Sequence, residues 1–267
     1  MADSDKSAET KVVRLPREKG RIGRGADRFA ARWRKGMRWV IWRLFQLTIG
    51  FVLVSFLLVI LLRFVNPYLT PYYVSERMRL GEISRDWTPI EEFSSVVPRA
   101  MVAAEDANFC KHFGFDVEAI KAALADDGRL RGGSTISQQV AKNVFLWQGR
   151  TWLRKGLEAW FTVLIELVWP KERILEVYLN IAEFDEGVFG AGTAAGSYFG
   201  TTPDRIGPEW AGRLAAVLPN PQDRSASNPS AFVRKRGRAI SSGAATIAAD
   251  GRADCFEAVD QRVFSWQ

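Results

Sequence analysis

Histidine and cysteine are scarce in this chain of 267 residues, which has one histidine, His112, and two cysteines, Cys110 and Cys255. Catalysis by a Ser-His-Asp or Cys-His set, and metal sites built from several histidines, could use only that one imidazole. The sequence around it supplies no partners for such a set. The two cysteines could form one disulfide. A single pair does not indicate a disulfide-stabilised fold, and the sequence does not give the distance between them, so we expect no disulfide.

Charge is absent from residues 44–62, a run of 19 residues framed by Arg43 and Arg63. A helix of that length rises about 28 Å, close to the hydrocarbon thickness of a bilayer. A cleaved signal peptide is the alternative, but the run is too long and no small-residue cleavage site follows it. We therefore predict a single transmembrane anchor, with Trp33, Trp39 and Trp42 near the headgroups on one side.

Basic residues are concentrated before this run. Residues 1–43 hold 13 Lys and Arg against 5 Asp and Glu, a net charge of +8, whereas the whole chain carries +7. The positive-inside rule keeps such a tail in the cytoplasm and puts the rest of the chain across the membrane. A nucleic-acid partner would also suit a basic chain. Anionic lipid beside the tail accounts for the same charge, so we expect no nucleic acid.

These features divide the chain into four parts. We predict a basic cytoplasmic tail (1–38), a transmembrane anchor (39–65), a globular domain (66–240) and a C-terminal extension (241–267). The extension is rich in Ala, Gly and Asp, so we expect it to pack weakly.

An acid pair, Glu105 and Asp106, follows the apolar residues 100–104. Apolar neighbours desolvate a carboxylate and raise its pKa towards the range of a useful general base. Taken alone, the pair could equally be an ordinary pair of surface acids at a helix end.

A second polar segment begins at Gly132 and Gly133. Thr135 and Gln138 have the spacing of a capping box, which predicts a helix starting at Thr135. Gln138 or Gln139 then shares a face with Lys142, so the lysine is directed towards a common site. A capped helix with a solvated face is the alternative.

A third segment, at about residues 151–169, has the apolar spacing of an amphipathic helix. Arg150, Arg154 and Glu158 fall at four-residue steps on another face, with Lys155 beside them. These cations are suitable donors for phosphate oxygens, with Glu158 placed to orient them or to help hold a divalent cation. An ion-paired surface would give the same pattern.

Five motifs stand in a recognisable order: Glu105-Asp106-x-x-Phe109-x-x-His112-x-Gly114, Gly132-Gly-Ser-Thr-Ile-Ser-Gln-Gln-x-x-Lys142-Asn143, Arg154-Lys155-x-x-Glu158, Ile174-Leu-Glu-x-Tyr178-Leu-Asn180 and Leu214-Ala-Ala-x-Leu-Pro-Asn-Pro221. Over about residues 70–235 the chain resembles the peptidoglycan glycosyltransferases of family 51. The resemblance implies a mainly α, lysozyme-like glycosyltransferase domain preceded by one transmembrane helix, with a smaller lobe that dips into the membrane.

The resemblance also implies a function. Such an enzyme polymerises lipid II into uncrosslinked glycan strands at the bacterial inner membrane, by inverting glycosyl transfer that releases undecaprenyl pyrophosphate. The catalytic domain would be periplasmic. The sequence has no Ser-x-x-Lys and no Lys-Thr-Gly, so no penicillin-binding transpeptidase accompanies this domain.

The implied partners are lipid II, the lipid-linked growing strand, the membrane, and cell-division or cell-wall synthesis proteins. No organic cofactor is expected, and a divalent cation, Mg²⁺ or Mn²⁺, is compatible with the residues.

Site roles follow from the same resemblance. Glu105 and Glu158 are the expected catalytic residues, with Glu105 as the base. The leaving pyrophosphate is a stabilised anion that needs cations more than an acid. The expected substrate-binding residues are Asp106, Ser134, Gln138, Lys142, Arg150, Arg154 and Lys155. His112 and Asn143 are expected to hold loops.

Two other classes of function remain open at this point. A lysozyme-like hydrolase would cut glycan, but it has no use for a cationic pyrophosphate site. A non-catalytic membrane-anchored cell-wall scaffold would not need Glu105, Lys142 and Glu158.

Overall fold

The computed structural model describes residues 21–125 and 133–257, which fall into two units divided between Val54 and Ser55. Helix α1 (Arg21–Phe64) gives its first part to one unit and its last residues, from Ser55, to the other. Residues Arg32–Phe64 of this helix are long and apolar enough to cross a membrane, and they contain the charge-free run. The structure therefore has the helix that the predicted anchor requires.

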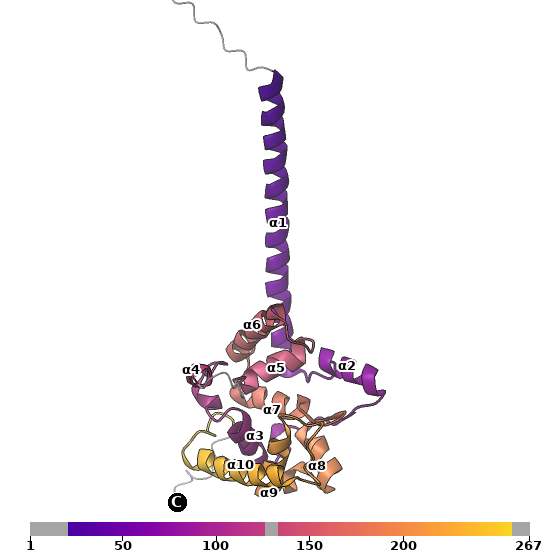
Figure 1. Cartoon of the computed structure of the whole chain (residues 1–267), viewed down its shortest axis with the longest axis vertical. Coiled ribbons are helices and arrows are strands. Elements are labelled where there is room, and N and C mark those ends of the chain that lie inside the picture. The colour runs from indigo at the N-terminus through magenta and orange to yellow at the C-terminus, as the bar shows by residue number, and fades with distance from the viewer. Residues whose placement is uncertain (1–20, 126–132, 258–267) are drawn as a thin grey trace, which may run out of the picture. The chain divides into compact units, whose positions relative to one another are not determined.

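The second unit is mainly helical, as predicted (Figure 1). Its helices are α2 (Pro71–Leu80), α3 (Val96–Glu105), α4 (Val117–Ala125), α5 (Ile136–Phe145), α6 (Trp152–Val168), α7 (Lys171–Ile181), α8 (Ala191–Phe199), α9 (Pro208–Val217) and α10 (Ala231–Ala249). Three short turns of 3-10 helix are η1 (Ile90–Glu92), η2 (Phe109–Lys111) and η3 (Pro203–Arg205).

The strands are short and form one small sheet. They are β1 (Ser84–Arg85), β2 (Glu183–Asp185) and β3 (Val188–Phe189), in the order β1-β3-β2. Strand β3 pairs in parallel with β1 and antiparallel with β2.

Helix α2 begins with two local features. The Thr70 side chain accepts a hydrogen bond from the Tyr73 backbone N–H, and Pro71 opens the helix. A capping threonine and a proline at the first helical position are both common at helix starts.

Helix α7 lies at the centre of the second unit (Figure 1). Its residues 177–181 are all buried, which places protein on every side of the helix. Helix α5 packs against α7, and Ile136, Val140 and Ala141 of α5 are fully buried. This packing fixes the position of α5 and of the motif residues that it carries.

Helix α10 lies along α9 (Figure 1) and also packs on α3. Its contact with α9 is close because both helices present glycine. A Cβ on Gly212 would lie 2.3 Å from the Gly237 carbonyl oxygen. Ala244 and Ile247 are buried, so the expectation of weak packing from residue 241 is wrong as far as the structure is described. The small residues there serve close packing.

The expectation of no disulfide is also wrong. Cys110 and Cys255 form one, with their Cα atoms 5.6 Å apart. The two cysteines are 145 residues apart in the sequence, so the sequence alone did not indicate that they are close. They meet because α10 packs on α3. Glu257 pairs with Arg99 of α3 in the same region. The end of the described chain is thus fastened beside the loop that follows the acid pair.

Replacing both Cys110 and Cys255 with alanine is expected to lower the free energy of unfolding by about 2–5 kcal/mol, because the disulfide restricts the unfolded chain. Denaturant unfolding of the full chain in detergent would measure this. The reduced wild type serves as the matched control and should lose a similar amount. Equal unfolding midpoints for the oxidised and reduced wild type would contradict the stabilising role.

Candidate active site

The acid pair lies at the end of α3, on the wall of a cavity of about 240 Å³. Ser134 and Thr135, from the segment that opens α5, line the same cavity. Ser134 is exposed there, as a substrate-binding residue must be. The structure therefore brings the first two sequence motifs together.

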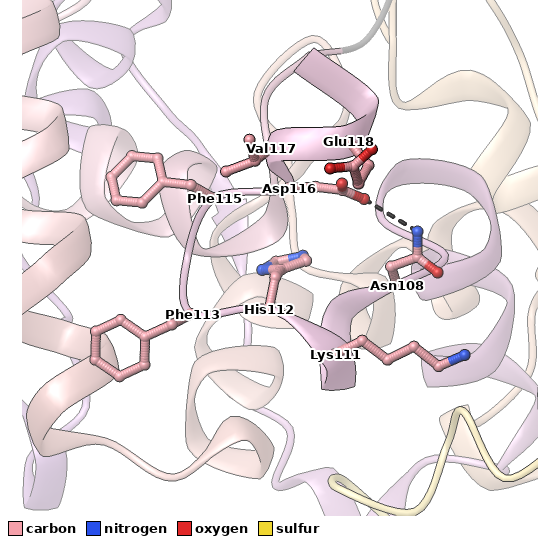
Figure 2. A pocket seen from close by; sticks show the side chains of 8 residues that line it. All are labelled: Asn108, Lys111, His112, Phe113, Phe115, Asp116, Val117 and Glu118. Atoms are coloured by element: carbon pink, nitrogen blue, oxygen red, sulfur yellow. Dashed lines mark hydrogen bonds between the residues drawn. The ribbon is translucent and has the colours of Figure 1, made fainter. Parts of the chain in front are cut away.

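An adjoining depression of about 430 Å³ shares Asn108 and Asp116 with this cavity. Figure 2 shows Phe113 and Phe115 on one side of it, with Asn108 and Asp116 facing each other across a hydrogen bond of 3.1 Å.

Glu105 is partly desolvated at this cavity. Its Oε2 accepts a hydrogen bond of 3.0 Å from Gln139 Nε2. Burial raises the pKa of Glu105 above the usual value, while the Gln139 hydrogen bond and the charges of Arg236 and Lys142 oppose that rise. The raised pKa predicted from the apolar neighbours is confirmed.

Asp106 has protein partners at both carboxylate oxygens. Oδ1 lies 2.7 Å from His112 Nε2, and Oδ2 accepts a hydrogen bond of 3.0 Å from the Ile136 backbone N–H at the start of α5. The side chain is buried. We expected Asp106 to bind substrate, but these contacts favour a positioning role, because the carboxylate joins α3 to α5.

His112 is joined to more than Asp106. Its carbonyl accepts a hydrogen bond of 2.9 Å from Lys171 Nζ. The motif glycine that follows, Gly114, has a φ of 78°, and a Cβ there would lie 2.6 Å from Thr162 Cγ2. These contacts fit the expected role of His112 in holding its loop.

The capping box predicted for α5 is confirmed. Thr135 Oγ1 accepts from the Gln138 backbone N–H, and Gln138 Oε1 accepts from the Thr135 backbone N–H. Gln138 is therefore buried and engaged in the cap, whereas Gln139 reaches Glu105. The contacts favour Gln139 over Gln138 as the glutamine at the site. Asn143 is also buried, and its Oδ1 accepts from Gln148 Nε2 at 3.3 Å.

Three expected site residues form one ion-paired cluster on α6. Glu158 Oε2 lies 2.6 Å from Arg154 Nη1, and Glu158 Oε1 pairs with Lys155 Nζ. The Glu158 side chain is only 4% exposed, so its charge depends on these two cations. The predicted gathering of cation and carboxylate is found here.

Lys142 of α5 is affected by the charges of both this cluster and Glu105. Burial lowers the pKa of Lys142, and the charges of Arg154 and Lys155 lower it further. The carboxylates of Glu158 and Glu105 act in the opposite direction on the same pKa. A buried lysine shared by two carboxylates is suited to receive an anionic ligand.

Comparison with known proteins gives the family. A family model described as transglycosylase matches residues 74–245. The chain belongs to the transglycosylase family. The matched range includes every site residue expected from the sequence, as well as most of α10.

Several curated relatives carry the name biosynthetic peptidoglycan transglycosylase. The chain is similar to that of Jannaschia sp. (strain CCS1), with 58% identity over 187 residues, covering 70% of this chain and 78% of the relative. The relative from Stutzerimonas stutzeri is 50% identical over 209 residues, with 75% and 86% covered. That from Caulobacter vibrioides is 48% identical over 200 residues, with 74% and 87% covered.

One of the cations expected at the site stands apart from the α6 cluster. Arg150 is exposed in the segment before α6, and no ion pair joins it to Glu158 among the residues that the structure describes. Its long side chain is solvated rather than held, so a role in substrate binding stays a prediction.

Asp106, His112 and Asp116 each offer one candidate metal-ligand atom, and these atoms lie within 4.8 Å of one another. Most of their candidate ligand atoms already have protein partners, although His112 Nδ1 is buried and has none among the described residues. Asp116 Oδ1 caps α4 at the Ala119 N–H, while Asp106 and His112 bond each other. Glu158, the other expected cation ligand, is likewise paired at both oxygens. These groups do not fit a metal ion in this arrangement, and we assign none to them.

Sequence reasoning missed two residues near Glu105. Tyr178 of α7 is fully buried, and burial and the charges of Glu105 and Asp106 raise its pKa. Arg236 of α10 acts on the pKa of Glu105. The basic stretch at residues 233–238 was the available signal for Arg236, but the packing of α10 on α3 was not evident.

Replacing Glu158 with leucine is expected to lower the free energy of unfolding by about 3–5 kcal/mol, because the buried Arg154 guanidinium would lose its carboxylate partner. Replacing Arg154 and Glu158 together with leucine should recover most of that loss. Denaturant unfolding of both variants beside the wild type measures the difference. A single variant as stable as the wild type would show that the pair does not hold α6 in place.

Proposed function

We propose that this protein polymerises lipid II into uncrosslinked glycan strands, with Glu105 as the general base and with Lys142, Arg154 and Lys155 binding the pyrophosphate of the donor. The observation that carries the proposal is that Glu105, at the wall of the cavity, and the ion-paired cluster of Arg154, Lys155 and Glu158 both act electrostatically on the same lysine, Lys142. The relatives' name, biosynthetic peptidoglycan transglycosylase, supports the substrate class.

Glu105 has the features of a base for a sugar hydroxyl. Gln139 holds Oε2, and Oε1 accepts no hydrogen bond from the described residues. As the acceptor hydroxyl forms its bond to the anomeric carbon of the donor, its proton passes to Glu105. The bond from that carbon to the pyrophosphate breaks on the opposite face, which inverts the configuration. A raised pKa makes Glu105 a stronger base for this step than an ordinary carboxylate.

The leaving group requires positive charge. Lys142, Arg154 and Lys155 would donate hydrogen bonds to the phosphate oxygens as the negative charge grows on them. Glu158 touches the cations rather than the reacting atoms, so we assign it a positioning role in place of the expected catalytic one. Pyrophosphate leaves without a proton, so a second carboxylic acid of the kind that an inverting hydrolase uses is not needed.

Contacts between α1 and the domain support a membrane location. Trp169 Nε1 donates a hydrogen bond of 2.7 Å to the Val59 carbonyl, and Arg63 Nη1 donates one of 2.7 Å to the Val168 carbonyl. Val59 belongs to the charge-free run, so the end of α6 packs beside the anchor. Leu153 and Leu167 of α6 are 69% and 65% exposed, as suits a surface that meets lipid.

The orientation is part of the proposal. The basic residues before the anchor favour a cytoplasmic N-terminus, which puts the site in the periplasm. A disulfide is also typical of that compartment, and Cys110 and Cys255 form one.

Replacing Glu105 with glutamine is expected to reduce polymerisation at least about 100-fold, because the amide cannot take the hydroxyl proton. The measurement is the formation of strands from labelled lipid II, separated by gel. Glu172→Gln, an exposed substitution on α7, is the matched control and should polymerise normally. Near-normal strand formation by Glu105→Gln would exclude Glu105 as the base, and cutting of preformed glycan with lipid II left intact would favour a hydrolase.

Replacing Lys142 with alanine is expected to weaken donor binding by about 10-fold or more, because a charge-assisted hydrogen bond to phosphate is lost. Its thermal unfolding should change little, since burial of the ammonium group is itself unfavourable. Donor titration of the variant measures the affinity, with Lys235→Ala as an exposed control. An unchanged donor affinity would refute the phosphate-binding role.

A further inference from the structure

Glu105 lies in an electrostatic environment made by four parts of the chain. The charged or titratable groups that act on it are the adjacent Asp106, Lys142 of α5, Tyr178 of α7 and Arg236 of α10. Two of these groups are cations, and they come from different helices. Lys142 belongs to the proposed phosphate site, whereas Arg236 has no role in the function proposed above.

Arg236 is held at this position by the packing of α10. A Cβ on Gly243 would lie 3.5 Å from the Ala103 Cβ, so α10 passes close to the last turn of α3. Arg236 precedes Gly243 by about two helical turns and therefore lies on a similar face of α10. The close contact of the neighbouring Gly237 with Gly212 fixes this part of the helix.

The guanidinium of Arg236 is not explained by local hydrogen bonding. Its Nε is buried and has no hydrogen-bond partner among the described residues. Burying an unpaired donor costs about 1–3 kcal/mol, so packing alone does not favour arginine here. Its charge acts on Glu105, where it stabilises the ionised carboxylate.

We propose that Arg236 is a positioning residue that keeps Glu105 ionised while the donor pyrophosphate occupies Lys142. The inference rests on the proposed function. A bound pyrophosphate would offset the positive charge of Lys142 and add negative charge near Glu105, and both changes favour protonation of the base. Arg236 lies on α10, outside the cluster of α5 and α6, so its charge remains available to Glu105 when the donor is bound.

The direction in which Arg236 changes the pKa of Glu105 follows from its charge. Burial raises the pKa of Glu105, and Arg236 lowers it. Without that cation the pKa rises further, and a larger share of Glu105 is protonated at a given pH. The low-pH limb of the activity profile therefore moves to higher pH.

The test is the initial rate of lipid II polymerisation against pH for the full-length wild type, Arg236→Gln, Arg236→Lys and the control Arg238→Gln. Arg238 is exposed on the same helix. We expect the midpoint of the low-pH limb to rise by about one pH unit in Arg236→Gln, with the rate at high pH close to that of the wild type. Arg236→Lys and Arg238→Gln should keep the wild-type midpoint.

Two outcomes would overturn the proposal. An unchanged profile for Arg236→Gln excludes an electrostatic effect on the base. An equal loss of rate at every pH, with the same midpoint, shows that the arginine only supports packing. Arg236→Met, which keeps the aliphatic stem, repeats the comparison if the glutamine variant does not fold.

A second measurement separates this inference from the proposed function. Infrared titration of substrate-free protein follows the Glu105 carboxyl band, assigned by its loss in Glu105→Gln. The midpoint should be about one pH unit higher in Arg236→Gln or Arg236→Met than in the wild type. This result is expected even if lipid II is not the substrate, and equal midpoints would refute the role of Arg236. Failure of the wild type to polymerise lipid II would refute the proposed function alone.

Discussion

The Asp106 carboxylate joins the segments on which the candidate active site depends. One oxygen bonds the imidazole of His112, and the other accepts the first backbone N–H of α5. A buried carboxylate is stable only with such partners. Because both are satisfied, the end of α3 and the start of α5 have one relative position, which brings Glu105 to Gln139 and Lys142.

The sequence predicted the parts of this arrangement that depend on local rules. The capping box joins Thr135 to Gln138, three positions later, so the start of α5 could be predicted from the sequence. The spacing of Arg154 and Glu158 is one helical turn, and their ion pair follows from it. The mainly helical class and the membrane helix followed from periodicity and length in the same way.

The features that the sequence did not reveal depend on tertiary packing. Gln138 could be read as the capping glutamine, but the contact of the adjacent Gln139 with Glu105 depends on how α5 packs beside α3. The disulfide and Arg236 both depend on α10 crossing α3. The same helix also packs on α9, where Gly212 of α9 lies opposite Gly237 of α10, and neither glycine is informative alone.

The charge of the assembled site agrees with a pyrophosphate ligand better than with a neutral sugar alone. Asp106 is bonded to His112 and Ile136, which leaves Glu105 and Glu158 as the carboxylates that face the cations. The cations that act on these two carboxylates are Lys142, Arg154 and Lys155, together with Arg236 at Glu105. Buried positive charge is unfavourable without an anion, and the lowered pKa of Lys142 reflects that cost. A diester of pyrophosphate carries two negative charges, so its binding would offset positive charge of Lys142, Arg154 and Lys155, and its departure would restore that charge. The same residues would then bind the donor and favour the leaving group, while Glu105 needs a cation of its own to remain a base.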